Sequence, residues 1–183
     1  MKDLSLHILD IVQNSIHAGS NEIEICITET DDNRLMVSIH DNGSGMDKEH
    51  TAKVTDPFYS TKNKRFGLGL ALLEQKAKQC NGSLMISSEI GKGTHVTASF
   101  EKDHVDIPPL GDMVMTMKLL ICSYPGKRFV YKHIRGNNEY KFDTDEVAEA
   151  LGDIDIDNPG ILKIITDMMK ENLEERGICW KEP

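Results

Sequence analysis

Asp41-Asn42-Gly43-Ser44-Gly45-Met46 is the stretch that decides how the rest of the chain is interpreted. It follows residues 35–40, whose alternating apolar side chains predict a β-strand. A carboxylate at the end of a strand, with glycines two and four positions later, predicts a tight turn whose backbone can lie against a flat ligand. Asp41 would then be a fixed acceptor at the bottom of a pocket, suited to an exocyclic amine. An ordinary hairpin turn is the alternative interpretation.

Composition and charge exclude several classes of protein. The 183 residues are enough for one ordinary domain or two small ones, and no apolar run approaches a membrane-spanning helix. The N-terminus lacks the apolar core and cleavage site of a signal peptide. A net charge of −9 argues against nucleic-acid binding. The cysteines are far apart without paired metal-ligand spacing, so we expect reduced thiols in a cytoplasmic protein. They are Cys26, Cys80, Cys122 and Cys179.

Residues 4–18 carry apolar side chains at helical spacing, which predicts a helix with a broad apolar face. Asp10 and Asn14 are four positions apart and therefore share one side of this helix. His17 follows three positions later. These polar side chains are candidates for a site, and a solvent-exposed polar face is the alternative.

A long polar segment and a glycine pair follow the first predicted hairpin, which comprises strands at 22–29 and 35–39. Residues 55–65 are basic and lack periodicity, and a loop of this length is uncommon in a compact domain unless it has a function. Gly67 and Gly69 then begin a predicted helix. Glycines at a helix start leave backbone N–H groups free to bind an anion, whereas a glycine hinge or a close helix crossing is the alternative.

The remaining pattern predicts a layered α+β structure. Strands are expected at 83–88 and 94–100, so the first hundred residues read as helix, hairpin, loop, helix and hairpin. Between the first hairpin and the loop, we expect a short helix or irregular segment at 46–54. After residue 100, we expect a linker at 101–109, a helix at 111–123 and a second hairpin at 128–134 and 139–142. A helix from 144 to 151 with Thr144 as its cap and an amphipathic helix at 161–176 complete the pattern.

In this order, these motifs resemble the ATP-binding domain of the gyrase, heat-shock chaperone, histidine kinase and mismatch-repair (GHKL) superfamily, over residues 4–100. The resemblance implies an α+β, Bergerat-type two-layer sandwich, in which helices cover a mixed, mostly antiparallel sheet, with a small α+β C-terminal extension. It also implies an ATP-binding domain at residues 1–103 and a C-terminal segment of unassigned role at residues 104–183.

The resemblance implies roles for particular residues. Asn14 matches the asparagine that coordinates Mg²⁺, Asp41 the carboxylate that binds the adenine amino group, and Thr94 a threonine near the adenine edge. Asp10 holds the position of the catalytic general base, although relatives that hydrolyse ATP carry a longer Glu there. The implied ATP-binding residues are Asn14, His17, Asp41, Gly43, Gly45, Met46, Phe58, Lys62, Arg65, Gly67, Leu68, Gly69, Leu70 and Thr94.

This sequence departs from the pattern of histidine kinases at several places, and these differences affect which function we expect. Arg65-Phe66 stand where histidine kinases usually carry a further glycine, and anti-sigma serine kinases often have Arg there. We expect no helical hairpin with a phosphorylatable histidine before the first helix, and we expect His7 to be a packing residue. Relatives also contribute a strand before that helix. We therefore expect the hairpin at 128–142 to complete or extend the sheet. The alternative is that the C-terminal segment forms a dimer surface.

The resemblance thus implies a cytoplasmic signal-transduction protein that binds Mg-ATP under a short lid and acts as a regulatory protein kinase toward an unidentified protein partner. Nucleic acid and membrane are not expected as partners, and a homodimer is left open. The alternatives are a slow ATPase, or a non-enzymatic nucleotide-dependent switch that docks partners through its Met-rich C-terminal part.

Overall fold

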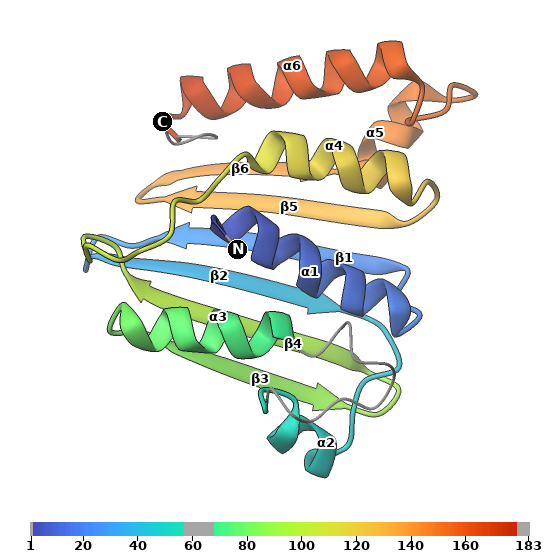
Figure 1. The fold of residues 1–183 in the computed structure, drawn as a ribbon. Coiled ribbons are helices and arrows are strands. Elements are labelled where there is room, and N and C mark those ends of the chain that lie inside the picture. Colours follow the sequence, from blue (N-terminus) through green and yellow to red (C-terminus); the bar gives the residue numbers. More distant parts are fainter. Residues whose placement is uncertain (1, 57–67, 179–183) are drawn as a thin grey trace.

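One six-stranded sheet organises the chain in the computed structural model, which describes residues 2–56 and 68–178 (Figure 1). The strand order is β3-β4-β2-β1-β5-β6. The strands are β1 (Glu22–Glu29), β2 (Arg34–Asp41), β3 (Ser83–Glu89), β4 (Gly93–Glu101), β5 (Arg128–Arg135) and β6 (Asn138–Asp143). The helices are α1 (Leu4–His17), α2 (Lys48–Lys53), α3 (Leu68–Gln79), α4 (Met113–Ser123), α5 (Thr144–Leu151) and α6 (Pro159–Glu175).

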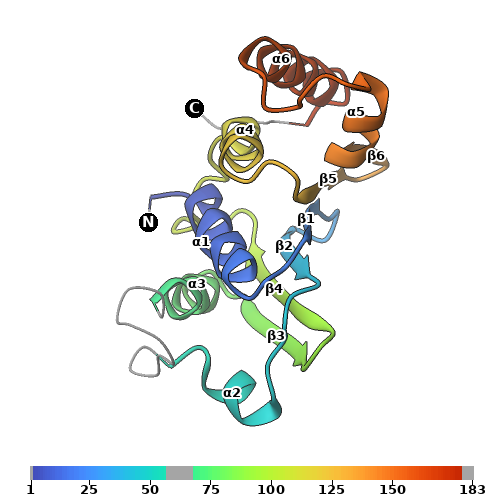
Figure 2. The same ribbon diagram turned by 90° about the vertical axis from the view of Figure 1, so that its right-hand side faces the viewer.

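The sheet is mixed and mostly antiparallel, as predicted. Every neighbouring pair of strands is antiparallel except β1 and β5, which run parallel. Alternation along β1 sends Ile23, Ile25 and Ile27 to the side of the sheet covered by helices, where each is fully buried. Helices α1, α3 and α4 lie together on that side (Figure 2). The two-layer α+β sandwich is therefore confirmed.

Helix α1 follows its sequence pattern closely. Its apolar side chains Leu4, Ile8 and Val12 are buried against the sheet. The side chain of Asp3 accepts a hydrogen bond from the backbone N–H of Leu6 and so caps the helix start. The buried face fixes the rotation of α1, and this places its polar residues next to the end of β2.

The second hairpin extends the sheet from the C-terminal segment. Strand β5 pairs with the whole of β1, from Glu22 opposite Arg128 to Glu29 opposite Arg135. Helix α4 contributes Met113 and Met117 to the same apolar cluster as β1, and α6 packs on α4 and β6. One sheet and one core therefore run across the expected boundary at residues 103 and 104. The division into two domains stays a prediction about independent folding.

At two helices, aspartates change the predicted N-terminus: the cap residue differs at α5 and the first residue differs at α4. Asp143, rather than Thr144, is the N-cap of α5, and it accepts a hydrogen bond from the backbone N–H of Asp145. Asp112 caps α4, so that helix begins at Met113 instead of Gly111. The expected short helix at 46–54 is present as α2. Within the described residues, no helix is long and apolar enough to cross a membrane.

Candidate functional site

The carboxylate of Asp41 is the centre of the candidate site. It ends β2 with only 4% of its surface exposed. The Ser15 hydroxyl donates to Oδ2 at 2.7 Å, and the Gly43 N–H donates to Oδ1 at 2.8 Å. A carboxylate has about four acceptor positions, so Asp41 retains acceptor capacity. No Lys, Arg or His of the described ranges forms an ion pair with it. This arrangement suits a neutral donor such as an exocyclic amine.

Glycines let the turn after Asp41 pack tightly against the β3–β4 connection. Gly45 has φ 64°, and a Cβ atom there would lie 1.9 Å from the carbonyl oxygen of Glu89. A Cβ at Gly43 would lie 2.9 Å from Oδ1 of Asp41. The N–H of Gly91 donates to the carbonyl oxygen of Ser44 at 2.8 Å. The geometry of the turn therefore requires glycine at 45, and at Gly43 a side chain would crowd the Asp41 carboxylate.

The β2–β4 register brings Thr94 and Met46 to the same place. Thr94 lies directly opposite Asp41 in the antiparallel pair. The hydroxyl of Ser88 accepts a hydrogen bond from the Met46 N–H at 2.8 Å and shares another with Thr94 Oγ1 at 2.9 Å. Three of the predicted residues, Asp41, Met46 and Thr94, are therefore joined at one end of the sheet.

Asn14 and His17 approach this end from α1. Ser15 follows Asn14 directly, so its bond to Asp41 fixes that turn of α1 beside the end of β2. Asn14 is half-buried and His17, at the end of the helix, is exposed. No cluster of three or more His, Cys, Asp or Glu side chains suited to a metal occurs in the described part of the chain. The assignment of Asn14 to Mg²⁺ stays a prediction from the sequence.

Asp10 lies against the start of α3. A Cβ atom at Gly69 would lie 1.7 Å from Oδ2 of Asp10, so only glycine allows this approach. Burial raises the pKa of the Asp10 carboxyl above its usual value of 3.8. His7, one turn earlier, is buried as expected of a packing residue, and burial lowers its pKa despite a hydrogen bond with the Gly69 backbone. The absence of a side chain at Gly69 thus allows the Asp10 carboxyl to lie at the N-terminus of α3.

Several predicted residues do not contribute to this geometry. Phe58, Lys62, Arg65 and Gly67 lie outside the described residues. Leu68 begins α3, and Leu70 is half-buried against the core. The expected lid therefore stays a prediction.

Three residues at the site were missed from the sequence. Ser15, Asn42 and Ser88 all bond to the turn or its neighbours. Ser15 carried a signal, because it lies on the buried side of α1 beside Asn14. Ser88 carried none until the strand register was known. Asn42, directly after the acid, is a residue type that often bonds to nearby backbone in turns.

Comparisons with known proteins agree with this geometry. Residues 2–104 match the family described as histidine kinase-, DNA gyrase B-, and HSP90-like ATPase. The chain is similar to a putative sensor protein of Shewanella frigidimarina, with 33% identity over 97 residues, and to sensor histidine kinase ZraS of Klebsiella oxytoca, with 35% identity over 92 residues. It is also similar to sporulation kinase E of Bacillus subtilis, with 34% identity over 94 residues.

The matched region is about half of this chain but a small part of those relatives. It covers 51%, 49% and 49% of this chain and 15%, 20% and 13% of the three relatives, respectively. Among solved structures, the N-terminal domain of a DNA repair protein superposes with a TM-score of 0.54 at 16% identity, covering 78% of this chain and 52% of that one. That likeness supports the fold alone.

Proposed function

Because the chain belongs to the histidine kinase-, DNA gyrase B- and HSP90-like ATPase family, we propose that it binds Mg-ATP and acts as a regulatory protein kinase toward a partner protein. The observation that carries the proposal is the buried Asp41 carboxylate, which has acceptor capacity left over and a glycine backbone beside it. Adenine has a donor amine on a flat ring, and this is the ligand shape that the turn can admit.

At the end of the site next to Asp41, side chains held in place by hydrogen bonds would bind the adenine ring. Asp41 would accept from the exocyclic amine, and its position is set by Ser15 and Gly43. Thr94 and Met46 would border the ring, since Ser88 holds both next to Asp41. Because these contacts exist before ligand binds, little ordering cost would oppose binding at this end.

The phosphate end would lie between α1 and the start of α3. The first N–H groups of a helix lack partners within that helix, so the start of α3 would favour an anion. Asn14 would bind Mg²⁺ through its amide oxygen, and the bound ion would neutralise part of the phosphate charge. The family resemblance assigns Lys62 and Arg65 to a lid, where their positive charges would also offset the negative charge of the phosphates.

Asp10 would act as the general base. A carboxylate whose pKa is raised by burial takes up a proton more readily than a solvated one. It would accept the proton from a hydroxyl of the partner protein as that oxygen attacks the terminal phosphate. With Asp10 in this role, the partner protein would bind on the α1–α3 side of the molecule.

A slow ATPase is the second candidate, and the same residue favours it. Asp10 lies against Gly69 at the start of α3, and there its carboxylate could equally well deprotonate a small nucleophile such as water. A switch that binds ATP without turning it over remains the third candidate, in which nucleotide alone changes affinity for the partner.

γ-labelled ATP distinguishes the three candidates. Label on a co-purified protein supports the kinase, released phosphate supports the ATPase, and unaltered ATP supports the switch. Isolation of the bound partner from cells, followed by the same assay with that partner, identifies the acceptor.

Two substitutions test the site itself. Asp41→Asn should weaken ATP binding by about tenfold to a hundredfold, because the amide lacks the charge and presents a donor in place of one acceptor. Asp10→Asn should abolish turnover and leave the Kd for ATP unchanged. Glu24→Gln, on the other side of the sheet, is the control and should change neither. Unaltered ATP affinity in Asp41→Asn would refute the adenine assignment.

A further inference from the structure

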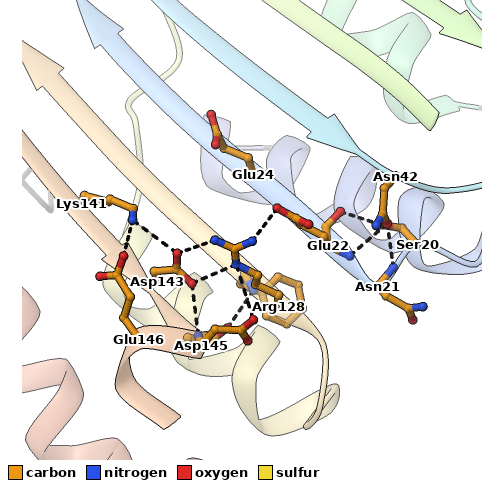
Figure 3. A network of polar contacts seen from close by, with 12 residues as sticks. Ser20, Asn21, Glu22, Glu24, Asn42, Arg128, Lys141, Asp143, Asp145 and Glu146 are labelled. Atoms are coloured by element: carbon orange, nitrogen blue, oxygen red, sulfur yellow. Dashed lines mark hydrogen bonds and ion pairs between the residues drawn. The ribbon is translucent and has the colours of Figure 1, made fainter. Parts of the chain in front are cut away.

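A polar network joins the turn after Asp41 to the C-terminal hairpin through the segment Ser20–Glu22 (Figure 3). On the turn side, the Oδ1 atom of Asn42 accepts three hydrogen bonds. They come from the Ser20 hydroxyl at 2.9 Å and from the backbone N–H groups of Asn21 and Glu22 at 3.0 Å each. Because Asn42 follows Asp41 directly, the position of this segment constrains the turn that carries the purine-binding carboxylate.

On the hairpin side, Lys127 and Arg128 hold the same segment. The Arg128 N–H donates to the carbonyl oxygen of Asn21 at 2.9 Å, and Nη1 of Arg128 donates to Oε1 of Glu22 at 2.9 Å. The ammonium group of Lys127 donates to the carbonyl oxygen of Ser20. Asn21 is therefore bonded on one side to Asn42 and on the other to Arg128.

Asp143 fixes the guanidinium group of Arg128. Nε and Nη2 donate to the two carboxylate oxygens at 3.2 and 2.8 Å, a bidentate arrangement that sets the plane of the group (Figure 3). Asp143 itself is only 2% exposed, and its Oδ1 atom accepts from the N–H of Asp145 at the start of α5. The hairpin thus presents a rigid cation to the segment beside the turn.

We infer that Lys127 and Arg128 are positioning residues for the purine-binding turn, so that the C-terminal hairpin forms part of the nucleotide site although it lies outside residues 2–104. This inference rests on the proposed ATP binding at Asp41. The expected effect is partial, because Ser15 and Gly43 also hold Asp41 directly.

The ratio of Kd values for two nucleotides distinguishes a role of Lys127 and Arg128 in positioning the turn from a role in overall stability. ATP offers an amine to Asp41, whereas inosine triphosphate presents a carbonyl oxygen at the same position of the ring. A displaced turn should therefore reduce the preference for ATP over inosine triphosphate. A variant that is only less stable binds both nucleotides with an unchanged ratio of Kd values.

Two variants of the full chain test the inference. Lys127→Met removes the contacts to Ser20, and the double variant Arg128→Gln with Asp143→Asn removes the ion pair without leaving a buried unpaired charge. Asn is also a good helix cap, so α5 keeps its N-cap. Lys132→Met is the matched control, since Lys132 also joins β5 to β1, through Glu24, but lies away from Asn42.

The measurements are Kd values for both nucleotides by calorimetry, with urea unfolding of each variant. We expect the preference for ATP to fall about fivefold to tenfold in the double variant, less in Lys127→Met, and not at all in Lys132→Met. An unchanged ratio in both test variants, or an equal fall in the control, would overturn the inference. Wild-type protein that binds neither nucleotide would instead overturn the proposed function. If the double variant fails to fold, Lys127→Met alone decides.

Discussion

The parallel strands β1 and β5 carry different polar networks at their two ends, and only one of these ends lies next to the proposed nucleotide site. At the end next to Asp41, Arg128 pairs with Glu22 and Asp143, and its side chain is 36% exposed. At the far end, His133 has no exposed surface and lies between Tyr131 and Glu29. The same two strands therefore carry a half-solvated network at one end and a sealed one at the other.

The sealed end has a complete hydrogen-bond assignment. Ionised Glu29 only accepts, so Nε2 of His133 donates to it at 3.1 Å, and in the neutral imidazole Nδ1 then accepts from the Tyr131 hydroxyl at 3.0 Å. Lys102 also bonds to Glu29. A buried network of this kind is costly to alter because each broken bond leaves an unpaired polar group. The half-solvated end can change its contacts more cheaply, since water replaces a lost partner.

The largest effect should follow from a truncation that removes the contacts of β5 at both ends of the β1–β5 pair. Truncation after His104 deletes β5 and exposes the pairing edge of β1 along all eight residues of that strand. It also removes α4, whose Met113 and Met117 are fully buried. We expect loss of soluble, cooperatively unfolding protein, measured by yield and circular dichroism. A soluble truncated protein that binds ATP with native affinity would show that residues 104–183 are a separate domain.

The next effect is a local one at the sealed end. His133→Leu leaves the buried Tyr131 hydroxyl without its partner, and this should cost about 2 kcal/mol of unfolding free energy. Adding Tyr131→Phe removes the orphaned group and should recover part of that cost. Urea unfolding measures both, and calorimetry should show an unchanged Kd for ATP. If His133→Leu alters nucleotide selectivity as the Arg128 double variant does, the two ends are not independent.

Acid unfolding compares the two ends directly. The hydrogen bond from His133 lowers the pKa of Glu29 from its usual 4.5 to about 2, and that from Arg128 lowers the pKa of Asp143 from 3.8 to about 2. Because both folded-state values lie below the usual ones, the stabilisation is fully present above the usual pKa and is lost as pH falls through about 2.

Glu29→Gln and Asp143→Asn should therefore each flatten the loss of stability in acid. The slope of unfolding free energy against pH should fall by up to about 1.4 kcal/mol per pH unit, the value for one proton, between pH 4.5 and about 2 for Glu29→Gln and between pH 3.8 and about 2 for Asp143→Asn. Urea unfolding at a series of pH values measures the slope. A wild-type slope in either variant would contradict the proton linkage at that end.

Much of the fold was predictable because its signals are local. The alternation in residues 22–29 and the helical spacing in residues 4–18 each concern neighbours in the sequence, and both elements appear as expected. The glycines at 43 and 45 predicted a tight turn that a flat ligand could approach; the turn is present, and at Gly45 the backbone lies too close to Glu89 for a side chain.

The rest depends on contacts between distant residues, which local patterns do not encode. The parallel pairing of β1 with β5 joins Glu22 to Arg128, and no periodicity in either strand selects that partner over another. The bond from Ser15 to Asp41 likewise depends on how α1 sits on the sheet. Asp143 was assigned no role because its two functions, capping α5 and pairing with Arg128, arise only after β6 is in place.

The smallest effect should come from the ion pair that lies between the two ends. Lys132 Nζ lies 2.9 Å from Glu24 Oε2, and the two side chains are 29% and 39% exposed. Exposed pairs contribute about 0–1 kcal/mol, because water solvates both partners when the contact is lost. Lys132→Met should therefore change the unfolding free energy by less than about 0.5 kcal/mol, with wild-type Kd values for ATP and inosine triphosphate. A larger loss would mean that any cross-strand ion pair between β1 and β5 matters, and the end next to Asp41 would then have no special role.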